Sequence, residues 1–361
     1  MSFILIIQIV LVHSNNLGYF LPNKEYNGTP IACLNSFIQY SITDGLARTA
    51  LPLFFIISGY LFFQNIKDFH FFIEFYCYKL RNRFYTLSIP YLFWSFWGIV
   101  TYFIFMLGRA VFLNTELLWP FSNIIDYLKI IFINPIPGQL WYIRELILYT
   151  LSAPILLILI KKLKIFLILG FFVIWICNID LLNFISEKGL FFYCLGAYGS
   201  IFLKEKFASV DTRIPDNIRK LLPVMWILTI TTYALNKIFF QLEIDIYLMN
   251  LSICFGIIPT WNIYELLKEK IRYKIYNFSK NTFIIYAAHL PTIKYFYRIL
   301  LRFSFSEYAS LVLFFLVPIS VVLLLNIIGD IVDTYLPSFY KIISGSRNRN
   351  NNVPNIKVSL T

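Results

Sequence analysis

The chain has few charged residues for its length. Asp, Glu, Lys and Arg together make up 14% of the 361 residues, whereas hydrophobic residues make up 59% and the mean hydropathy is +0.70. Soluble domains carry roughly 25% charged residues, so this composition excludes a soluble globular protein. It is typical of a protein with several membrane-spanning helices. We therefore expect an all-α integral membrane protein.

The chain also lacks the short motifs that mark many sites. Its five cysteines contain no C-x-x-C pair, which favours small buried side chains and argues against a disulfide framework or a metal site. No G-x-S-x-G, Walker, H-E-x-x-H or glycine-rich dinucleotide motif is present, so none of the sites that these motifs build is indicated. We expect no metal. The cysteines are Cys33, Cys77, Cys177, Cys194 and Cys254.

Acidic residues are fewer than basic ones, and the formal net charge is +12. In a soluble protein such an excess suggests nucleic acid as a partner. In a membrane protein it is explained by lysines and arginines that gather in cytoplasmic loops. We expect contact with membrane lipid and no nucleic acid partner.

Apolar runs of suitable length predict a polytopic bundle of about ten transmembrane helices. With the N-terminus inside, 21 of the 31 lysines and arginines fall in loops assigned to the cytoplasm. The positive-inside rule then predicts a multi-pass protein of the inner (plasma) membrane with both termini cytoplasmic. The predicted spans are residues 3–20, 46–64, 85–107, 139–160, 164–180, 189–203, 220–240, 245–263, 280–300 and 307–330.

Residues 1–343 are predicted to form one transmembrane domain, and the polar residues 344–361 a disordered cytoplasmic tail. Two of the predicted outer segments are long, residues 15–45 and 108–139. The second contains apolar residues at helical spacing between Ile124 and Ile131. This run predicts an amphipathic helix, which is either a lid over a site or an ordinary surface helix.

Two ionisable residues stand out in the apolar runs. Arg48 lies in LARTALPLFFIISGYLFF, and a charge inside a span costs several kcal/mol unless it is paired or lines a wet cavity. The alternative is that Arg48 snorkels to the lipid headgroups. His13 lies about 15 Å along the first helix from Phe3, in the middle or outer half of the membrane. Histidine exchanges protons near neutral pH, but a lone buried histidine is more often a structural hydrogen-bonding residue.

Four segments, in order, resemble the acyltransferase-3 family of bacterial membrane O-acyltransferases. Residues from Arg48 to Phe62 resemble R-x-x-x-P-L-F-F-x-I-S-G-Y-L-F, and the stretch that ends at His13 and Ser14 resembles V-x-x-H-S/T. Residues 140–146, LWYIREL, resemble L-W-F-L-R-x-L, and residues 279–290, SKNTFIIYAAHL, resemble S-K-N-S-F-x-I-Y-L-x-H-P. The resemblance implies transfer of an acyl group, expected to be acetyl, from cytoplasmic acyl-CoA to a hydroxyl of a surface or exported polysaccharide or a lipid-linked glycan.

The resemblance also implies roles for particular residues. His13 would act as the general base or would help to relay the acyl group. Arg48 and Arg144 would position the acceptor or stabilise developing negative charge. The further residues implied in acceptor binding are Ser58, Tyr60, Trp141, Glu145 and His289.

Alternatives remain open for several of these residues. Trp141, Arg144 and Glu145 share a broad helix face by their spacing, but the two charged residues would equally serve structural pairing with neighbouring helices. His289 is either at the site or structural. Three basic residues in a predicted short loop, Lys79, Arg81 and Arg83, would hold the phosphates of acetyl-CoA. The alternative is that they only set topology and attract anionic lipid.

Two other functions are also open. Buried arginines between paired helices would suit a glycan or lipid transporter. The chain also opens at Met1-Ser2-Phe3 without the I-D-x-L-R-x-I-A-like stretch that usually begins family members. An inactive paralogue is therefore the second alternative.

Overall fold

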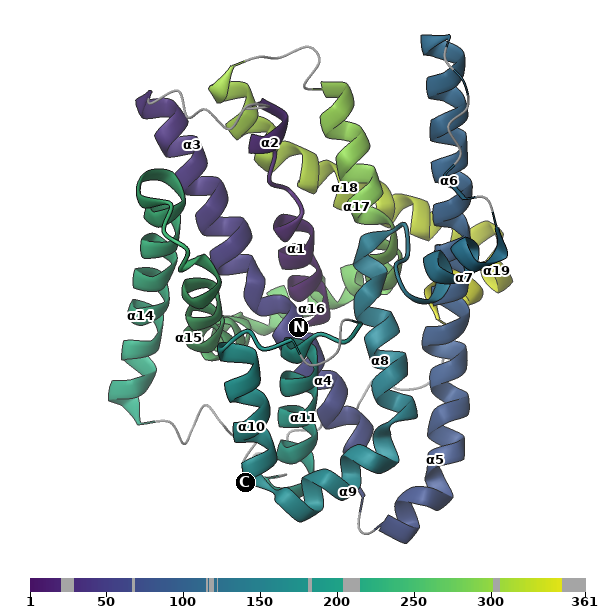
Figure 1. The fold of residues 1–361 in the computed structure, drawn as a ribbon, viewed down its shortest axis with the longest axis vertical. Coiled ribbons are helices and arrows are strands. Elements are labelled where there is room, and N and C mark those ends of the chain that lie inside the picture. Colours follow the sequence, from purple (N-terminus) through teal and green to yellow (C-terminus); the bar gives the residue numbers. More distant parts are fainter. Residues whose placement is uncertain are drawn as a thin grey trace.

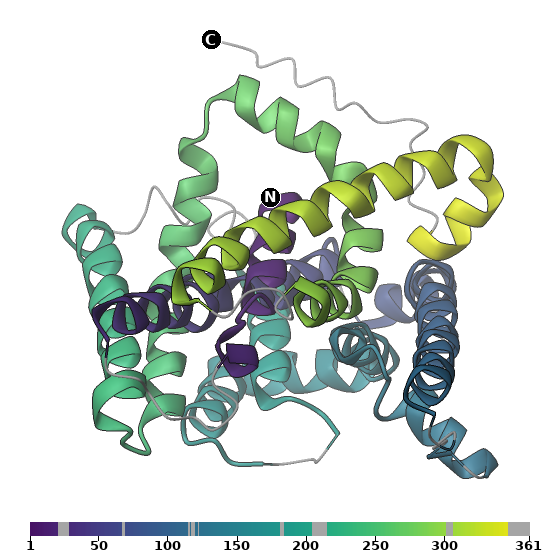
Figure 2. The same cartoon turned by 90° about the horizontal axis from the view of Figure 1, so that it is seen from above.

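A computed structural model describes residues 1–20, 29–66, 69–114, 116, 120–121, 123–180, 184–203, 215–300 and 306–345. Within these ranges every regular element is a helix (Figure 1), which confirms the all-α fold. α1 (Ser2–Val12) lies inside the bundle and contacts α4 (Ala50–Phe63) and α17 (Thr282–Leu300) (Figures 1 and 2). This central place brings the end of α1 close to several other helices.

The remaining helices surround these three. α18 packs against α17 and leads into α19, which lies against α6 (Figure 2). Their bounds are α2 Leu17–Phe20, α3 Pro30–Tyr40, α5 Phe69–Arg83, α6 Ile89–Leu113, α7 Ile124–Phe132, α8 Trp141–Leu151, α9 Ala153–Leu163, α10 Ile165–Ile176, α11 Glu187–Phe202, α14 Asp216–Leu235, α15 Asp245–Leu266, α16 Glu269–Phe278, α18 Glu307–Tyr335 and α19 Pro337–Ser344.

Five helical stretches of the described chain are long and apolar enough to cross a membrane, or six if α8 and α9, bent by 71°, count as one span. The expected multi-pass membrane protein is therefore confirmed, whereas the count of about ten spans is not. α1 and α10 have 11 and 12 residues, fewer than the roughly 20 that a helix needs to cross a bilayer. The five stretches are Pro30–Phe63, Phe72–Phe112, Asp216–Phe240, Asp245–Leu266 and Glu307–Tyr335.

Two segments that were predicted as loops are helical. Residues 30–45 continue into the span at 46–63, because the polar side chains of Asn35 and Gln39 are buried and bonded to each other. Lys79, Arg81 and Arg83 lie on α5, and Phe72 of that helix stacks on Phe63 at 5.9 Å between ring centroids. In both segments tertiary contacts support a helix that hydropathy alone did not reveal.

The long helix at residues 30–63 is irregular at its middle. A π-helical segment, Ser41–Leu46, and one 3₁₀ turn, Ala47–Thr49, separate α3 from α4. Such π segments are frequent at functional sites, and Arg48 lies in the 3₁₀ turn. The irregular segment therefore contains Arg48, the arginine that the sequence predicted to be functional.

α4 and α11 cross in close contact. A Cβ on Gly59 would meet the backbone of Tyr193, and a Cβ on Gly196 would meet the backbone of Ile56. Only glycine permits this approach, as at other close helix crossings in membranes. The crossing holds the start of α11 in fixed relation to α4.

The amphipathic run on the second predicted outer segment is helix α7, capped by Asn123, whose side chain accepts from the Asp126 amide. Ile124, Ile125 and Leu128 are exposed. Whether α7 is a lid or a surface helix stays a prediction. Of the predicted tail, Ser344 ends α19, and residues 346–361 lie outside the described residues.

Candidate active site

His13 ends α1 and meets a second histidine. Its amide donates to the Val10 carbonyl at 3.1 Å, and the next residue is held by a hydrogen bond from the Tyr297 hydroxyl to the Ser14 carbonyl at 2.7 Å. The His13 ring lies 5.3 Å from the ring of His289 on α17, measured between centroids. The two histidines named by the sequence therefore lie side by side.

The hydrogen bonds of His289 define its tautomer. Its Nδ1 lies 2.7 Å from the Tyr286 carbonyl oxygen and 3.1 Å from that of Ile285. A carbonyl oxygen only accepts, so Nδ1 carries a proton. The Nε2 atom is buried and has no hydrogen-bond partner among the described residues. Nε2 is therefore an acceptor available to a donor beside His13.

A cavity of about 80 Å³ lies beside His13. Arg48, Trp141 and Lys188 line it together with His13. Two cations from different helices thus share one small space with a titratable ring, and a group with developing negative charge would be stabilised there. The rest of the wall consists of Ile9, Val12, Ala47, Leu51, Gln139 and Tyr286.

Arg48 is paired within its own helix. Its Nη2 lies 2.6 Å and its Nε 3.2 Å from Oδ1 of Asp44, one turn earlier. A guanidinium has five N–H donors, so others remain for a bound group. Sequence reasoning missed Asp44, although the i, i+4 spacing of an acid and an arginine was visible in the sequence.

Lys188 was also missed as a site residue. It lies in the first turn of α11, and no carboxylate of the described residues forms an ion pair with it. The sequence placed Lys188 in an outer loop just before a weak span, where a lysine is unremarkable. Only the α4–α11 crossing shows that it reaches the cavity of His13.

The three residues predicted as a group on α8, Trp141, Arg144 and Glu145, have different surroundings. Trp141 lines the His13 cavity. Arg144 donates to the carbonyl oxygens of Ile133 and Phe184, and it is not among the residues that line this cavity. Trp141 and Arg144 therefore have different neighbours, and the role of Arg144 at the acceptor stays a prediction.

Glu145 is almost fully buried. Its carboxylate accepts from the Tyr149 hydroxyl at 2.9 Å and from the Ser186 amide at 2.7 Å. The bond to Ser186 holds the start of α11, and α11 is the helix that carries Lys188. A part for Glu145 or Arg144 in substrate binding stays a prediction, because their observed bonds go to the protein itself.

A second cavity, of about 270 Å³, shares the side chains of Ile9 and Tyr286 with the first. Ser58 lies in its wall, with its hydroxyl 3.2 Å from that of Tyr142. Arg83 lines the same cavity. The shared residues make the two cavities neighbours.

The other predicted residues lie elsewhere. Lys79 donates to the Phe62 carbonyl at 2.5 Å, and its ammonium and the Arg83 guanidinium lie over the Phe62 ring at 5.3 and 5.8 Å. Arg81 is exposed on α5 and Tyr60 is half-buried on α4. Of the three basic residues, Arg83 is the one that lines a described cavity.

A buried amide network holds the chain just beyond His13. Gln39 accepts from the Asn16 amide at 3.0 Å and donates to Asn16 Oδ1 at 2.7 Å and to Asn35 Oδ1 at 2.8 Å. Ser310 Oγ donates to Asn16 Oδ1 at 2.7 Å. All four residues have an exposed fraction of 0%. The network therefore ties the segment after His13 to α3 and α18.

Replacing Gln39 with leucine is expected to lower the thermal unfolding temperature of the purified protein in detergent. The change removes the partners of the Asn16 backbone N–H and of Asn35 Oδ1, and each buried polar group without a partner costs about 1–3 kcal/mol. Thr232→Ala is the matched control, because that exposed hydroxyl bonds only to its own helix. Equal unfolding temperatures for the two variants would show that the network does not stabilise this region.

The comparisons with known proteins point to one chemistry. Residues 3–328 match a family model described as an acyltransferase domain. The chain is 24% identical over 357 residues to the succinoglycan biosynthesis protein ExoH of Rhizobium meliloti (strain 1021). That alignment covers 96% of this chain and 91% of the relative. No solved structure matches the chain.

Proposed function

The chain belongs to the acyltransferase family whose model matches residues 3–328, and we propose that it acylates a polysaccharide hydroxyl with an acyl group, acetyl in the first instance, from cytoplasmic acyl-CoA. The acceptor is a surface or exported polysaccharide or its lipid-linked precursor. The similarity to a succinoglycan biosynthesis protein supports a polysaccharide as the acceptor. The observation that carries the proposal is the pair His13 and His289 beside a small cavity with two cations.

The donor enters from the side of Arg83. A phosphate of the acyl-CoA pairs with that guanidinium, while the acyl end extends through the second cavity past Ile9 and Tyr286. This orientation places Arg83 on the cytoplasmic face of the inner membrane, with both termini on the same side. Lys79 and Arg81 add positive charge on the same helix.

Transfer is one proton-coupled displacement. His13 takes the proton of the sugar hydroxyl, and that oxygen attacks the thioester carbonyl carbon. Arg48 and Lys188 stabilise the oxyanion that forms on the carbonyl oxygen. The carbon–sulfur bond then breaks, and the CoA sulfur leaves with the proton that His13 had taken. The products are a sugar ester and free CoA thiol.

His289 positions His13. With Nδ1 bonded to the Tyr286 carbonyl, its Nε2 has no partner among the described residues and would accept a hydrogen bond from an N–H of the neighbouring imidazole when substrate is bound. This arrangement leaves the other nitrogen of His13 unprotonated and free to act as the base. In this pair His289 orients the base, as a second group does in other catalytic pairs.

Membrane vesicles of opposite orientation test the proposal. Inside-out vesicles that contain the protein and its glycan should incorporate label from acetyl-CoA added outside, because the donor site faces the cytoplasm. Right-side-out vesicles should incorporate none until they are made permeable. Vesicles without the protein are the control. Equal labelling of both kinds would contradict the orientation, and movement of glycan without labelling would identify a transporter.

A further inference from the structure

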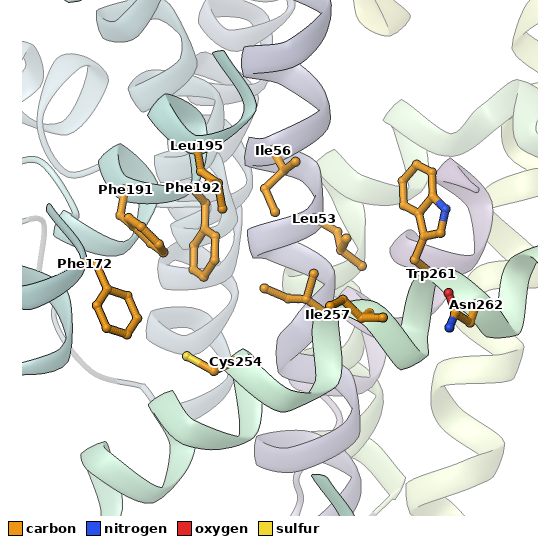
Figure 3. Close-up of a pocket in the computed structure, with 11 residues that line it drawn as sticks. Leu53, Ile56, Phe172, Phe191, Phe192, Leu195, Cys254, Ile257, Trp261 and Asn262 are labelled. Atoms are coloured by element: carbon orange, nitrogen blue, oxygen red, sulfur yellow. The ribbon is translucent and has the colours of Figure 1, made fainter. Parts of the chain in front are cut away.

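The largest described cavity that the reaction does not use lies between α4, α10, α11 and α15. It has a volume of about 350 Å³. Figure 3 shows Phe172 at one end and Trp261 and Asn262 at the other, with Leu53 and Ile56 between them. The other lining residues are Phe191, Phe192, Leu195, Cys254, Ile257 and Ile258. This cavity is larger than either of those near His13.

Water is a poor occupant for this cavity. Apart from Asn262, the side chains of the lining residues are apolar or, for Trp261 and Cys254, weakly polar. A cavity without polar partners stays dry, but it accepts apolar molecules. Two of its walls belong to the membrane-spanning stretches Pro30–Phe63 and Asp245–Leu266. Such helices are surrounded by the hydrocarbon chains of lipids.

One end of the cavity is polar, and three basic residues follow it along the chain. The side-chain oxygen of Asn262 is buried and accepts no hydrogen bond from the described residues. Lys268 follows shortly after the end of α15, and Lys270 and Arg272 lie in α16, all within ten residues of Asn262. In the described part of the chain no carboxylate forms an ion pair with these three. The Nε atom of Arg272 is also buried without a partner.

We propose that this cavity binds one hydrocarbon chain of an anionic phospholipid, whose phosphate lies against Lys268, Lys270 and Arg272. The charge of that segment selects the headgroup, and the apolar walls hold the chain. Under the orientation proposed above these basic residues face the cytoplasm, where anionic lipids attract basic segments next to membranes. The site is separate from His13 and does not depend on acyl transfer.

Cys254 reports on the cavity in the unaltered protein, because it is the one cysteine of the five among the lining residues. Purified protein stripped of lipid should react at Cys254 with the small apolar thiol reagent monobromobimane, as mapped by peptide mass spectrometry. Adding dioleoyl phosphatidylglycerol should abolish that labelling. Labelling of the exposed Cys77 and Cys177 should not change. Undiminished labelling of Cys254 at saturating phosphatidylglycerol would overturn the proposal.

Retained lipid, counted by native mass spectrometry, tests the two parts of the site. Ile257→Trp fills the cavity and should lose the bound phosphatidylglycerol, whereas Ile263→Trp, on the exposed side of the same helix, should keep it. Lys268→Gln with Lys270→Gln should lose the preference for phosphatidylglycerol over phosphatidylcholine with the same chains. Lys161→Gln with Lys162→Gln should not.

The competing occupants appear as contrary results. Equal retention of phosphatidylglycerol and phosphatidylcholine by the unaltered protein would refute a site that selects an anionic headgroup. Displacement of phosphatidylglycerol by an equal amount of polyprenyl phosphate would assign the cavity to a lipid-linked glycan instead. If Ile257→Trp does not fold, Leu195→Trp on α11 replaces it. The polyprenyl phosphate result would concern the acceptor of the proposed reaction, whereas the other results do not bear on acyl transfer and leave the proposed function untouched.

Discussion

His13→Asn is expected to abolish acyl transfer as completely as His13→Ala. Asparagine keeps hydrogen-bonding groups near the position of the ring but takes up no proton at neutral pH. A general base contributes about 10²- to 10⁴-fold to a rate, so both variants should lose at least that much. Label transferred from acetyl-CoA to glycan, in membranes with matched amounts of each variant, is the measurement.

The control for this prediction is His70→Asn. His70 lies on α5, with its side chain 90% exposed and 3.3 Å from Glu74, so its loss should leave transfer unchanged. If His13 were only a structural hydrogen-bonding residue, asparagine should restore much of what alanine loses. An active His13→Asn enzyme would therefore refute the catalytic role, and His13 would be a packing residue at the end of α1.

Arg48→Lys is expected to reduce transfer far more than a charge-conserving change ordinarily would. The guanidinium bonds Asp44 through two nitrogens and presents its remaining donors to the cavity. A lysine ammonium lacks this planar fork and cannot bind both groups in the same geometry. Removing one electrostatic donor to an oxyanion costs about 10²- to 10³-fold. The amount of protein in the membrane should stay the same while transfer falls.

Lys188→Gln should show a loss of the same order, because it removes the second cation of the cavity. Arg109→Lys is the matched control for Arg48, since Arg109 is exposed on α6. Normal transfer by Arg48→Lys would indicate that Arg48 only extends to the lipid headgroups. Normal transfer by Lys188→Gln would leave Arg48 alone as the stabilising group.

The sequence predicted the all-α membrane fold and three members of the cavity wall, His13, Arg48 and Trp141. It also named His289, but it could not show that the two histidines meet, because that requires the packing of α1 against α17. Composition and motifs carry no information on such a contact. Lys188 was missed for the same reason, since a lysine at the start of a short apolar run looks like a loop residue.

The errors in the helix map have a related cause. Asn35 and Gln39 break the apolar pattern of residues 30–45, and their polarity favoured a loop. In the folded chain these amides bond each other and Asn16, so their burial in a helix carries no unpaired group. The resemblance implied that Arg144 positions the acceptor; its guanidinium binds carbonyls of neighbouring segments, and that role stays a prediction.

The most direct measurement is mass spectrometry of the glycan after incubation with the purified protein in lipid vesicles and acetyl-CoA. The proposed reaction predicts an alkali-labile acetyl ester on the glycan and an equal amount of free CoA thiol, both lost with His13→Asn. A glycan of unchanged mass, with CoA still acetylated and the same vesicles moving glycan across the membrane, would contradict an acyltransferase and identify a transporter.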